Sequence, residues 1–461
     1  MKVFDTTKGE NSSRTEDFEK FAKSRADGEL LIPPEMLDRE SRRTYVRRTL
    51  REDHQYRIRN HPEAAEGKFA KLAEDLFSFF RGTALLYYRD LAGVDSHIPV
   101  VFTIGDIHPE NFGVMPNEDD VPFFGVNDFD EAYFAPFTFD LRRGATGFYL
   151  AGRRNGFSKK KCRRLVKHWT KGYIKGLVEF ARDDREKRFQ FRLDNSPDLI
   201  KDLIEGSIVS RDRFLKDKID FNTETFLTTD DVVPRSKLVG QFQGIIDDYL
   251  EENEVYGEDL GENFHIVKDV ALKRGSGTAS LGLERYWVLL QGRSGDSRDN
   301  IILEMKHART SALAGLTGQD IDSPGEEKTE AGKIAAAHRV HLAGGDRFYG
   351  AATIDEQSFL VRERSPLKND IDLEDLTAGK MRKYARICGK ALAQTHARSD
   401  SDTGIMKGDA EQRILEAIEP RLLVADMIRF GEHSARRLKR DWKAFRKDHR
   451  LGAFTFSNPG E

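Results

Sequence analysis

The chain has 461 residues, with 75 Lys and Arg against 78 Asp and Glu and a formal net charge of −3. This length predicts two lobes or domains with a large buried interior, and the balanced charge argues against a nucleic-acid binder. No run approaches the roughly 18 apolar residues of a membrane span. The start lacks an apolar signal segment and the two cysteines form no CxxC pair, so we expect a cytoplasmic protein without a membrane partner.

Residues 1–60 are polar and charged and are interpreted as an N-terminal arm. Its basic stretch is expected to be a solvated helix face, with a docking arm as the less favoured interpretation; the stretch contains Arg42, Arg43, Arg47, Arg48 and Arg51. Between residues 69 and 91, apolar residues recur at helical spacing, interrupted by Gly82. This pattern predicts a buried helix that leads into the following loop.

The segment TIGDIHPENFG, followed by FFGVNDFD, carries the chemistry. Asn111 lies five positions after Asp106, and Asp128 lies 22 positions after it. In protein kinases a loop Asp accepts the substrate hydroxyl proton, an Asn five residues later holds Mg²⁺, and a later Asp holds the metal that bridges the nucleotide phosphates. The spacing therefore predicts Asp106 as the catalytic carboxylate and Asn111 and Asp128 as metal ligands.

Two neighbouring residues are secondary candidates. Asp130 completes a triplet that resembles the Asp-Phe-Gly of kinases and is a further candidate metal ligand, while His108 is a candidate catalytic residue. The apolar residues before Asp128 predict a strand that delivers it.

The residues around Asp106 allow a second interpretation. Gly-Asp-x-His also opens the binuclear metallophosphoesterase pattern, in which Asp106 and His108 would ligate metal. Here Pro109 follows the His and no Gly-Asn-His occurs in the chain, so this interpretation is disfavoured. A solvated acidic loop is the third interpretation.

Two helices are predicted next, over residues 137–156 and 159–182. The second is basic, but its Trp169 shares a face with apolar residues, so a core-packed helix with a charged exterior is preferred over a phosphate-binding surface. Asp140 is expected either to hydrogen-bond the catalytic loop, as a helical Asp does in kinase-like folds, or to cap its helix. Residues 183–235 are expected to form peripheral helices.

Residues 265–308 predict three strands, with a Gly-rich turn between the first two. The turn has the Gly-x-Gly-x-x-Gly spacing of kinases, with Ala in place of the middle Gly, and its candidate nucleotide-binding residues are Gly277, Ala279, Ser280 and Gly282. Lys306, on the third strand, is placed as the kinase lysine that grips the phosphates.

Glu330, in the following helical segment, is the candidate ion-pair partner of Lys306, and Glu326 and Glu327 are alternatives. Residues 359–363 predict another strand, after which helices continue to the end.

The predicted elements stand in the reverse of the order found in ordinary kinases. Here the Gly-rich turn and the lysine follow the catalytic loop, whereas in kinases they precede it. We therefore predict an α+β, protein-kinase-like two-lobe fold that is circularly permuted, with a mainly helical large lobe and a small antiparallel β lobe. The predicted parts are the arm 1–60, a helical lobe 61–235 with the catalytic and metal-binding loops, a β-rich nucleotide-clamp lobe 236–365 and C-terminal helices 366–461 that pack on the large lobe. An unrelated β-domain at 265–310 is the alternative.

Several separated motifs, in order, resemble the bacterial domain-of-unknown-function 2252 family over nearly the whole chain: FFRGTALL, GDIHPENFG, NDFDEAYFAPFTFDLRR, GTASLGLERYWVLLQG and MKHARTSAL. The resemblance implies a kinase-like or aminoglycoside-phosphotransferase-like relationship and no established substrate. The family pattern usually has Gly at the positions of Ala135 and Ala279; the second difference weakens the expected phosphate clamp.

The leading hypothesis is an ATP- and Mg²⁺-dependent phosphotransferase that acts on a small-molecule or protein hydroxyl. A nucleotide-binding regulator or scaffold of the pseudokinase type, without turnover, is the alternative. Nucleotidyl transfer and the metallophosphoesterase complete the set of hypotheses.

Overall fold

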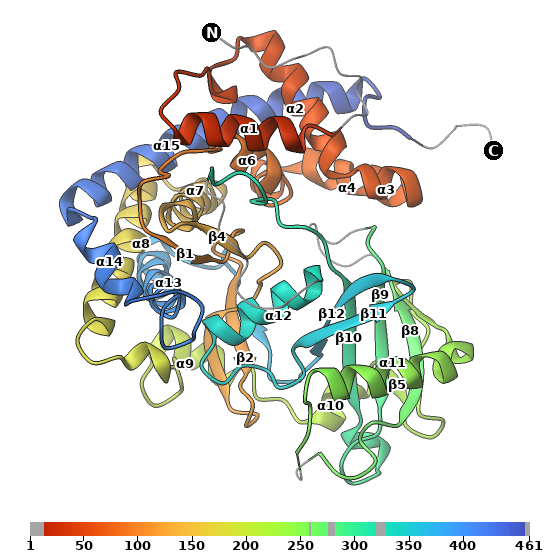
Figure 1. Ribbon diagram of the computed structural model, residues 1–461. Helices are drawn as coiled ribbons and strands as arrows, with labels where there is room; N and C mark the ends of the chain where they lie inside the picture. Colours follow the sequence, from red (N-terminus) through yellow and green to blue (C-terminus); the bar gives the residue numbers. More distant parts are fainter. Residues whose placement is uncertain (1–12, 258–259, 275–281, 319–328, 457–461) are drawn as a thin grey trace.

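The computed structural model describes residues 13–257, 260–274, 282–318 and 329–456. It is a mixed α+β protein, as predicted, and the strands that pair within its described residues do so in antiparallel fashion. Helices form one side of the molecule, a six-stranded sheet forms the other, and β2 lies between them (Figure 1). Among the described residues, every helix is too short or too polar to cross a bilayer.

The six-stranded sheet has the spatial order β11-β12-β10-β9-β8-β7. Its strands are β7 (Val232–Pro234), β8 (Val267–Lys273), β9 (Arg285–Leu290), β10 (Ile301–His307), β11 (Gly350–Ile354) and β12 (Gln357–Glu363). The three strands predicted between residues 265 and 308 are confirmed, as is the strand at 359–363, whereas β7 and β11 were not predicted.

Both faces of this sheet are covered, which explains the continuous apolar run of β9. Side chains alternate along a strand, so Val288 packs with α11 (Val239–Glu252) on one face, and Trp287 packs with Leu215 and Phe226 on the other. The second face is covered by three short elements: α10 (Arg211–Leu215), β5 (Ile219–Asp220) and β6 (Thr225–Phe226).

Two smaller sheets border the candidate site. The first pairs β1 (Val100–Thr103) with β4 (Tyr133–Pro136), and the second has the order β13-β2-β3, with β13 (Asn369–Asp370), β2 (Phe112–Pro116) and β3 (Pro122–Val126). The strand predicted before Asp128 is confirmed as β3. The described part of the chain also contains short 3₁₀ turns: η1 (Pro34–Met36), η2 (Arg185–Lys187), η3 (Ser236–Leu238) and η4 (Ser297–Asp299).

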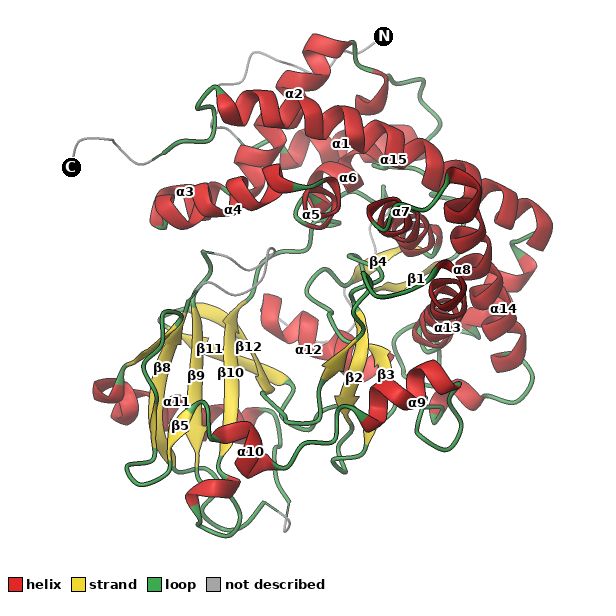
Figure 2. Ribbon diagram, turned by 180° about the vertical axis from the view of Figure 1, so that it is seen from behind, coloured by secondary structure: helices red, strands yellow, loops and turns green. Residues whose placement is uncertain are grey.

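The remaining helices, apart from α12 (Glu330–His341), which lies between the large sheet and β2 (Figure 2), form the helical side. They are α1 (Thr15–Ala26), α2 (Arg39–Asp53), α3 (Gln55–Asn60), α4 (Pro62–Glu74), α5 (Leu76–Arg81), α6 (Ala84–Asp90), α7 (Thr138–Arg154), α8 (Lys159–Phe180), α9 (Asp198–Glu205), α13 (Ala378–Ala397), α14 (Ala410–Glu416) and α15 (Pro420–Arg450). The two helices predicted at 137–156 and 159–182 are confirmed as α7 and α8.

The single helix predicted over residues 69–91 is wrong, because the segment forms parts of three helices. Asp75 has an extended backbone and caps α5 by accepting hydrogen bonds from Phe77 N and Ser78 N, so α4 ends before it. Gly82 then ends α5. The helical periodicity survives across these breaks because all three helices bury apolar residues in one core.

The expectation that the basic stretch of the N-terminal arm is a solvated helix face is wrong, because α2 packs into the helical side. In α2, Arg42 is buried and forms ion pairs with Asp90 (2.6 Å) and with Asp441 of α15 (2.7 Å). A solvated helix face was expected here. The carboxylates that neutralise this arginine come from distant parts of the chain, so a pattern local to α2 does not show them.

The helices α8 and α13 pack closely through glycines. A Cβ on Gly172 or Gly389 would meet a backbone carbonyl of the other helix. Between these helices and α7, Trp169 is fully buried and its Nε1 donates to Leu141 O (3.1 Å). The core-packed interpretation of the basic helix is therefore confirmed. The only two cysteines, Cys162 and Cys388, are buried free thiols in α8 and α13.

Candidate functional site

The loop between β1 and β2 carries three predicted site residues: Asp106, His108 and Asn111. Asp140, in the first turn of α7, accepts hydrogen bonds from the backbone N–H groups of Ile104 (2.7 Å) and Gly105 (2.9 Å). The expected bond from Asp140 to this loop is thus confirmed. Gly105 has a φ of +85°, and a Cβ there would strike the backbone of Glu131, so the loop is pinned at this turn.

A residue near the opposite end of the sequence supports Asp140. His396, on α13, places Nε2 3.1 Å from a carboxylate oxygen of Asp140, and its Nδ1 lies 2.8 Å from the hydroxyl of Tyr173. All three side chains are fully buried. When Nε2 of His396 carries the proton, the polar side-chain atoms of Tyr173, His396 and Asp140 all have hydrogen-bond partners. These three buried side chains therefore hold Asp140, and through it the backbone of the loop, in place.

Asp106 is held by Arg143, a buried arginine of α7. Its Oδ1 accepts hydrogen bonds from Arg143 Nε (2.9 Å) and Nη2 (2.6 Å), while its side chain stays 16% exposed. The guanidinium lies 4.0 Å from the ring centroid of Phe80 and 4.7 Å from that of Tyr87. The sequence reasoning missed Arg143. The sequence could have indicated Arg143, because it lies three residues after Asp140 and this spacing puts both side chains on one face of α7.

His108 is buried in a cationic setting. Its Nε2 accepts a hydrogen bond from Arg81 Nε (3.2 Å) and lies 3.9 Å from Asp106 Oδ2. Burial and the guanidinium groups of Arg81 and Arg143 hold the pKa of His108 well below its usual value. A neutral imidazole that faces an arginine suits a positioning role better than proton transfer or metal binding.

Asn111, Asp128 and Asp130 supply the oxygen donors. The Asn111 amide nitrogen donates to the carbonyl of Asp106 (2.6 Å), which leaves the amide oxygen on the other side of the group. Burial and the Asp130 carboxylate raise the pKa of Asp128 to about 6, and Asp106 contributes in the same direction. These carboxylates are therefore close enough to repel one another.

Lys306 joins the large sheet to this acidic centre. Its ammonium group forms an ion pair with Asp130, 176 positions away in the sequence. Burial opposes ionisation of Asp130, but this ammonium outweighs it and lowers the pKa of Asp130. On the neighbouring strand β12, Arg362 donates from Nε (3.1 Å) and Nη2 (2.8 Å) to the same carboxylate oxygen of Glu304, and it adds positive charge beside Asp128.

The remaining predicted residues are placed as follows. Glu330 begins α12 and pairs with Lys333 (3.0 Å), whereas the ion pair of Lys306 is with Asp130. Gly282 has a φ of +79°, and a Cβ on it would touch side chains of Ala64 and Arg57. The other candidates lie outside the described residues: Gly277, Ala279, Ser280, Glu326 and Glu327.

The N-terminal helices bring further buried charge to this region. In both views, α3 and α4 lie over one end of β9 and β10 (Figures 1 and 2). Burial and Arg309 lower the pKa of Arg57 to about 9, and burial raises the pKa of Glu131 to about 7. Arg309 itself lies 3.7 Å from Glu131 and 3.5 Å from Asp53. A small cavity of about 30 Å³ beside Lys306 is lined in part by Asp130, Glu131 and Arg309.

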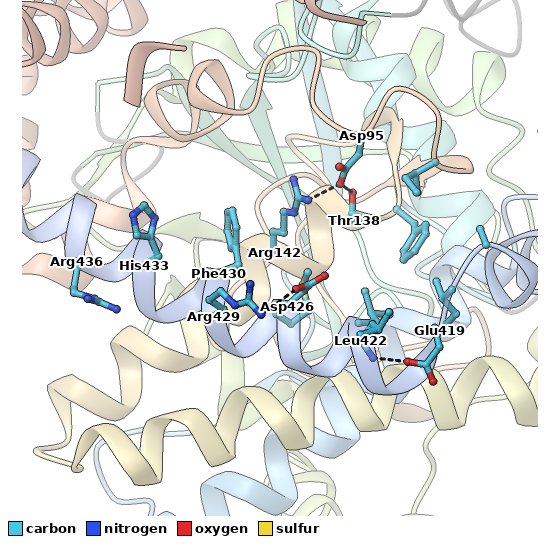
Figure 3. Close-up of a pocket in the computed structure, with 16 residues that line it drawn as sticks. Asp95, Thr138, Arg142, Glu419, Leu422, Asp426, Arg429, Phe430, His433 and Arg436 are labelled. Carbon is cyan, nitrogen blue, oxygen red and sulfur yellow. Dashed lines mark hydrogen bonds and ion pairs between the residues drawn. The ribbon is translucent and has the colours of Figure 1, made fainter. Parts of the chain in front are cut away.

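A larger hollow of about 540 Å³ lies between α7 and the first half of α15 (Figure 3). Apolar side chains such as Phe430 mix there with Arg142, Arg429 and His433, and Asp95 is bound to Arg142 (2.7 Å). None of the predicted site residues lines this hollow. The candidate active site is therefore the acidic centre at Asp106, Asp128 and Lys306.

This site defines a class of α+β protein in which a sheet lysine meets a cluster of loop carboxylates. Residues 59–448 match the family described as "Uncharacterized protein conserved in bacteria (DUF2252)", and the chain belongs to this family. No curated protein and no solved structure matches the chain.

Proposed function

We propose that the protein is an ATP- and Mg²⁺-dependent, kinase-like phosphotransferase with a circularly permuted two-lobe fold. The acceptor is a hydroxyl of a small molecule or a protein. One observation carries the proposal: the Lys306–Asp130 ion pair joins β10, the second strand after the Gly-rich segment, to the loop that presents Asp128. Kinases bring the same two parts together around the nucleotide phosphates.

The element order supports the permuted fold. From β8 to β12 the chain runs hairpin, lysine strand, helix and two more strands, which is the order around a kinase Gly-rich loop, strand lysine and αC helix. The end of α13 also lies beside the start of the catalytic segment, because Ser399 Oγ accepts a hydrogen bond from Phe102 N (3.0 Å). A chain that left α13 could therefore enter β1 directly if the order were not permuted.

The residues fit the proposed roles. Bound Mg²⁺ and ATP would supply the phosphoryl group and neutralise its charge, and the oxygens of Asn111 and Asp128 are hard donors suited to Mg²⁺. Arg143 occupies Oδ1 of Asp106, so Oδ2 is the oxygen free to orient an acceptor hydroxyl and take its proton. Because phosphoryl transfer is largely dissociative, orientation matters more here than the strength of the base.

Binding requires a rearrangement at Lys306. The cavity beside it is too small for a nucleotide, and its ammonium group contacts Asp130 directly. Phosphate oxygens would replace Asp130 as the partner of Lys306, so ligand binding would separate the sheet slightly from the loop.

Thermal unfolding with ATP, MgCl₂ or both tests the proposal. Saturation at 100 times the dissociation constant stabilises the native state by about 2.7 kcal/mol. We expect a shift for the wild type only with both ligands, and none for Asp128→Asn or Lys306→Met. Lys333→Met is the matched control, because it removes the same charge from α12, where its partner is Glu330.

Turnover separates the enzyme from a pseudokinase-type regulator. When no acceptor is present, water replaces the acceptor hydroxyl and the enzyme slowly hydrolyses ATP to ADP and phosphate; Asp106→Asn abolishes this release while leaving the unfolding shift in place. A regulator gives the shift without phosphate release that depends on Asp106. The absence of any shift in the wild type would refute nucleotide binding altogether.

A further inference from the structure

A second acidic group lies away from the candidate active site, where α13 ends. Five carboxylates gather there from η2, from the turn after α13 and from α14: Asp184, Glu186, Asp400, Asp402 and Glu411. Carboxylate oxygens of Asp184, Glu186 and Glu411 lie within 4.8 Å of one another, as do those of Glu186, Asp400 and Asp402. Glu186 belongs to both sets and therefore sits at the centre.

The inner carboxylates are buried without compensation. Glu186 is 1% exposed, and neither of its carboxylate oxygens has a hydrogen-bond partner among the described residues. Glu411 is 3% exposed, and its Oε2 also has no hydrogen-bond partner among the described residues. Leaving such carboxylate oxygens buried and without a hydrogen-bond partner is energetically costly. A cation bound among these oxygens would offset this cost.

The nearby basic side chains do not supply that cation. Arg398 donates to the backbone carbonyls of Val340 (2.6 Å), Glu186 (3.2 Å) and Lys187 (2.9 Å). Arg413 likewise donates to backbone carbonyls, at 3.3 and 3.4 Å. The Lys187 ammonium pairs with the exposed outer carboxylates of Asp184 and Asp402. Within the described part of the chain, Arg398 and Arg413 are near enough to attract the inner carboxylates but form no direct ion pair with them.

The spacing of the turn matches a calcium ligand pattern in three positions. A helix, a 12-residue loop and a second helix place Asp400, Asp402 and Glu411 at loop positions 1, 3 and 12, where EF-hand loops carry ligands. Asp400 Oδ1 accepts hydrogen bonds from Asp402 N (2.9 Å) and Thr403 N (3.4 Å), which closes the loop around this carboxylate. The loop departs from the EF-hand pattern at position 6, where Ile405 replaces the invariant Gly, and Glu186 from η2 adds a ligand from outside.

We propose that this cluster binds a divalent cation of the Ca²⁺ type, with Glu186 as the central ligand and Asp400 and Glu411 as its neighbours. Several flexible carboxylates suit the six to eight oxygen ligands of Ca²⁺ better than the strict octahedron of Mg²⁺. The ion ties η2, the end of α13 and α14 together. It also stabilises the segment that begins four residues after His396, the residue that supports Asp140. The site stands independently of the proposed phosphotransferase activity.

Calcium titration of chelator-treated protein tests this site directly. We expect calorimetry with CaCl₂ to show one ion per chain, and thermal unfolding to shift upward with CaCl₂ relative to EDTA. The variants Glu186→Gln and Glu411→Gln should each weaken Ca²⁺ binding by about tenfold or more, because each removes a charged ligand. Glu416→Gln is the matched control: it removes an exposed carboxylate from the same helix, and Ca²⁺ binding should be unchanged.

The direction of the change in unfolding temperature distinguishes a loss of Ca²⁺ binding from a variant that does not fold. In EDTA, Glu186→Gln should unfold at a higher temperature than the wild type, because it relieves carboxylate repulsion, whereas in CaCl₂ the order should reverse. A wild type without calcium binding, or a Glu186→Gln variant that keeps wild-type affinity, would overturn the site. A larger shift with MgCl₂ than with CaCl₂ would overturn the assignment to calcium. Asp128→Asn should retain the calcium response, so the two sites are tested separately.

Discussion

The substitution Asp140→Asn tests how the catalytic loop is held. The carboxylate of Asp140 is fully buried and bonds two loop N–H groups, at 2.7 and 2.9 Å, and His396 Nε2, at 3.1 Å. An amide keeps one acceptor oxygen but turns an NH₂ group toward the remaining donors. At least one buried donor then loses its partner, at about 1–3 kcal/mol, and the retained bonds lose their charge assistance. We expect the free energy of unfolding to fall by about 2–4 kcal/mol.

Urea unfolding at pH 7 measures this loss. The control is Asp426→Asn, since Asp426 is exposed on α15 and its ion pair with Arg429 is 3.9 Å long; its effect should stay within about 0.5 kcal/mol. The loss in Asp140→Asn should come with weaker ATP binding, because the loop carries Asp106 and Asn111. A variant that keeps wild-type stability would show that Asp140 does not anchor the loop, and the reasoning would be wrong.

Three further predictions concern packing, pH and buried charge. Gly389→Ala should lower stability by about 1–2 kcal/mol, because its Cβ meets the backbone of α8, whereas Gly240→Ala, with open space around it, should be neutral or stabilising by up to about 1 kcal/mol; chemical denaturation compares them. Burial lowers the pKa of His341 to about 3, so between pH 6.5 and 3 only the unfolded state takes up its proton and stability falls as the pH drops. From pH 7.5 to 5 the wild type should lose about 2 kcal/mol more than His341→Gln, and equal losses would contradict this. Arg42→Ala removes the ion-pair partner of buried Asp441 and should cost about 3–5 kcal/mol, measured in the same way; a loss below about 1 kcal/mol would show that the carboxylate is solvated.

Local patterns in the sequence identified the elements that have strong periodicity. The helices α7 and α8 and the strands β3, β8, β9, β10 and β12 were predicted because each shows a clear repeat of apolar residues. The strands β1, β2, β4 and β11, of four or five residues each, were not predicted. The strand β3 is equally short, but its apolar run stands just before Asp128. The single helix predicted over residues 69–91 was wrong for a different reason: the capping residue Asp75 and then Gly82 divide the segment into parts of three helices.

The sequence by itself was enough to single out Asp106, Asn111, Asp128 and Lys306 as candidate site residues, from their types and their spacing. It could do so because spacing along the chain is a local property. Only the tertiary structure decided the partners of these groups, since ion pairs join residues that are far apart in the chain. Arg143 on Asp106, Asp130 on Lys306 and His396 behind Asp140 all arise in this way. The calcium-type cluster has the same origin, because its central ligand, Glu186, comes from a segment more than 200 residues before the loop that completes it.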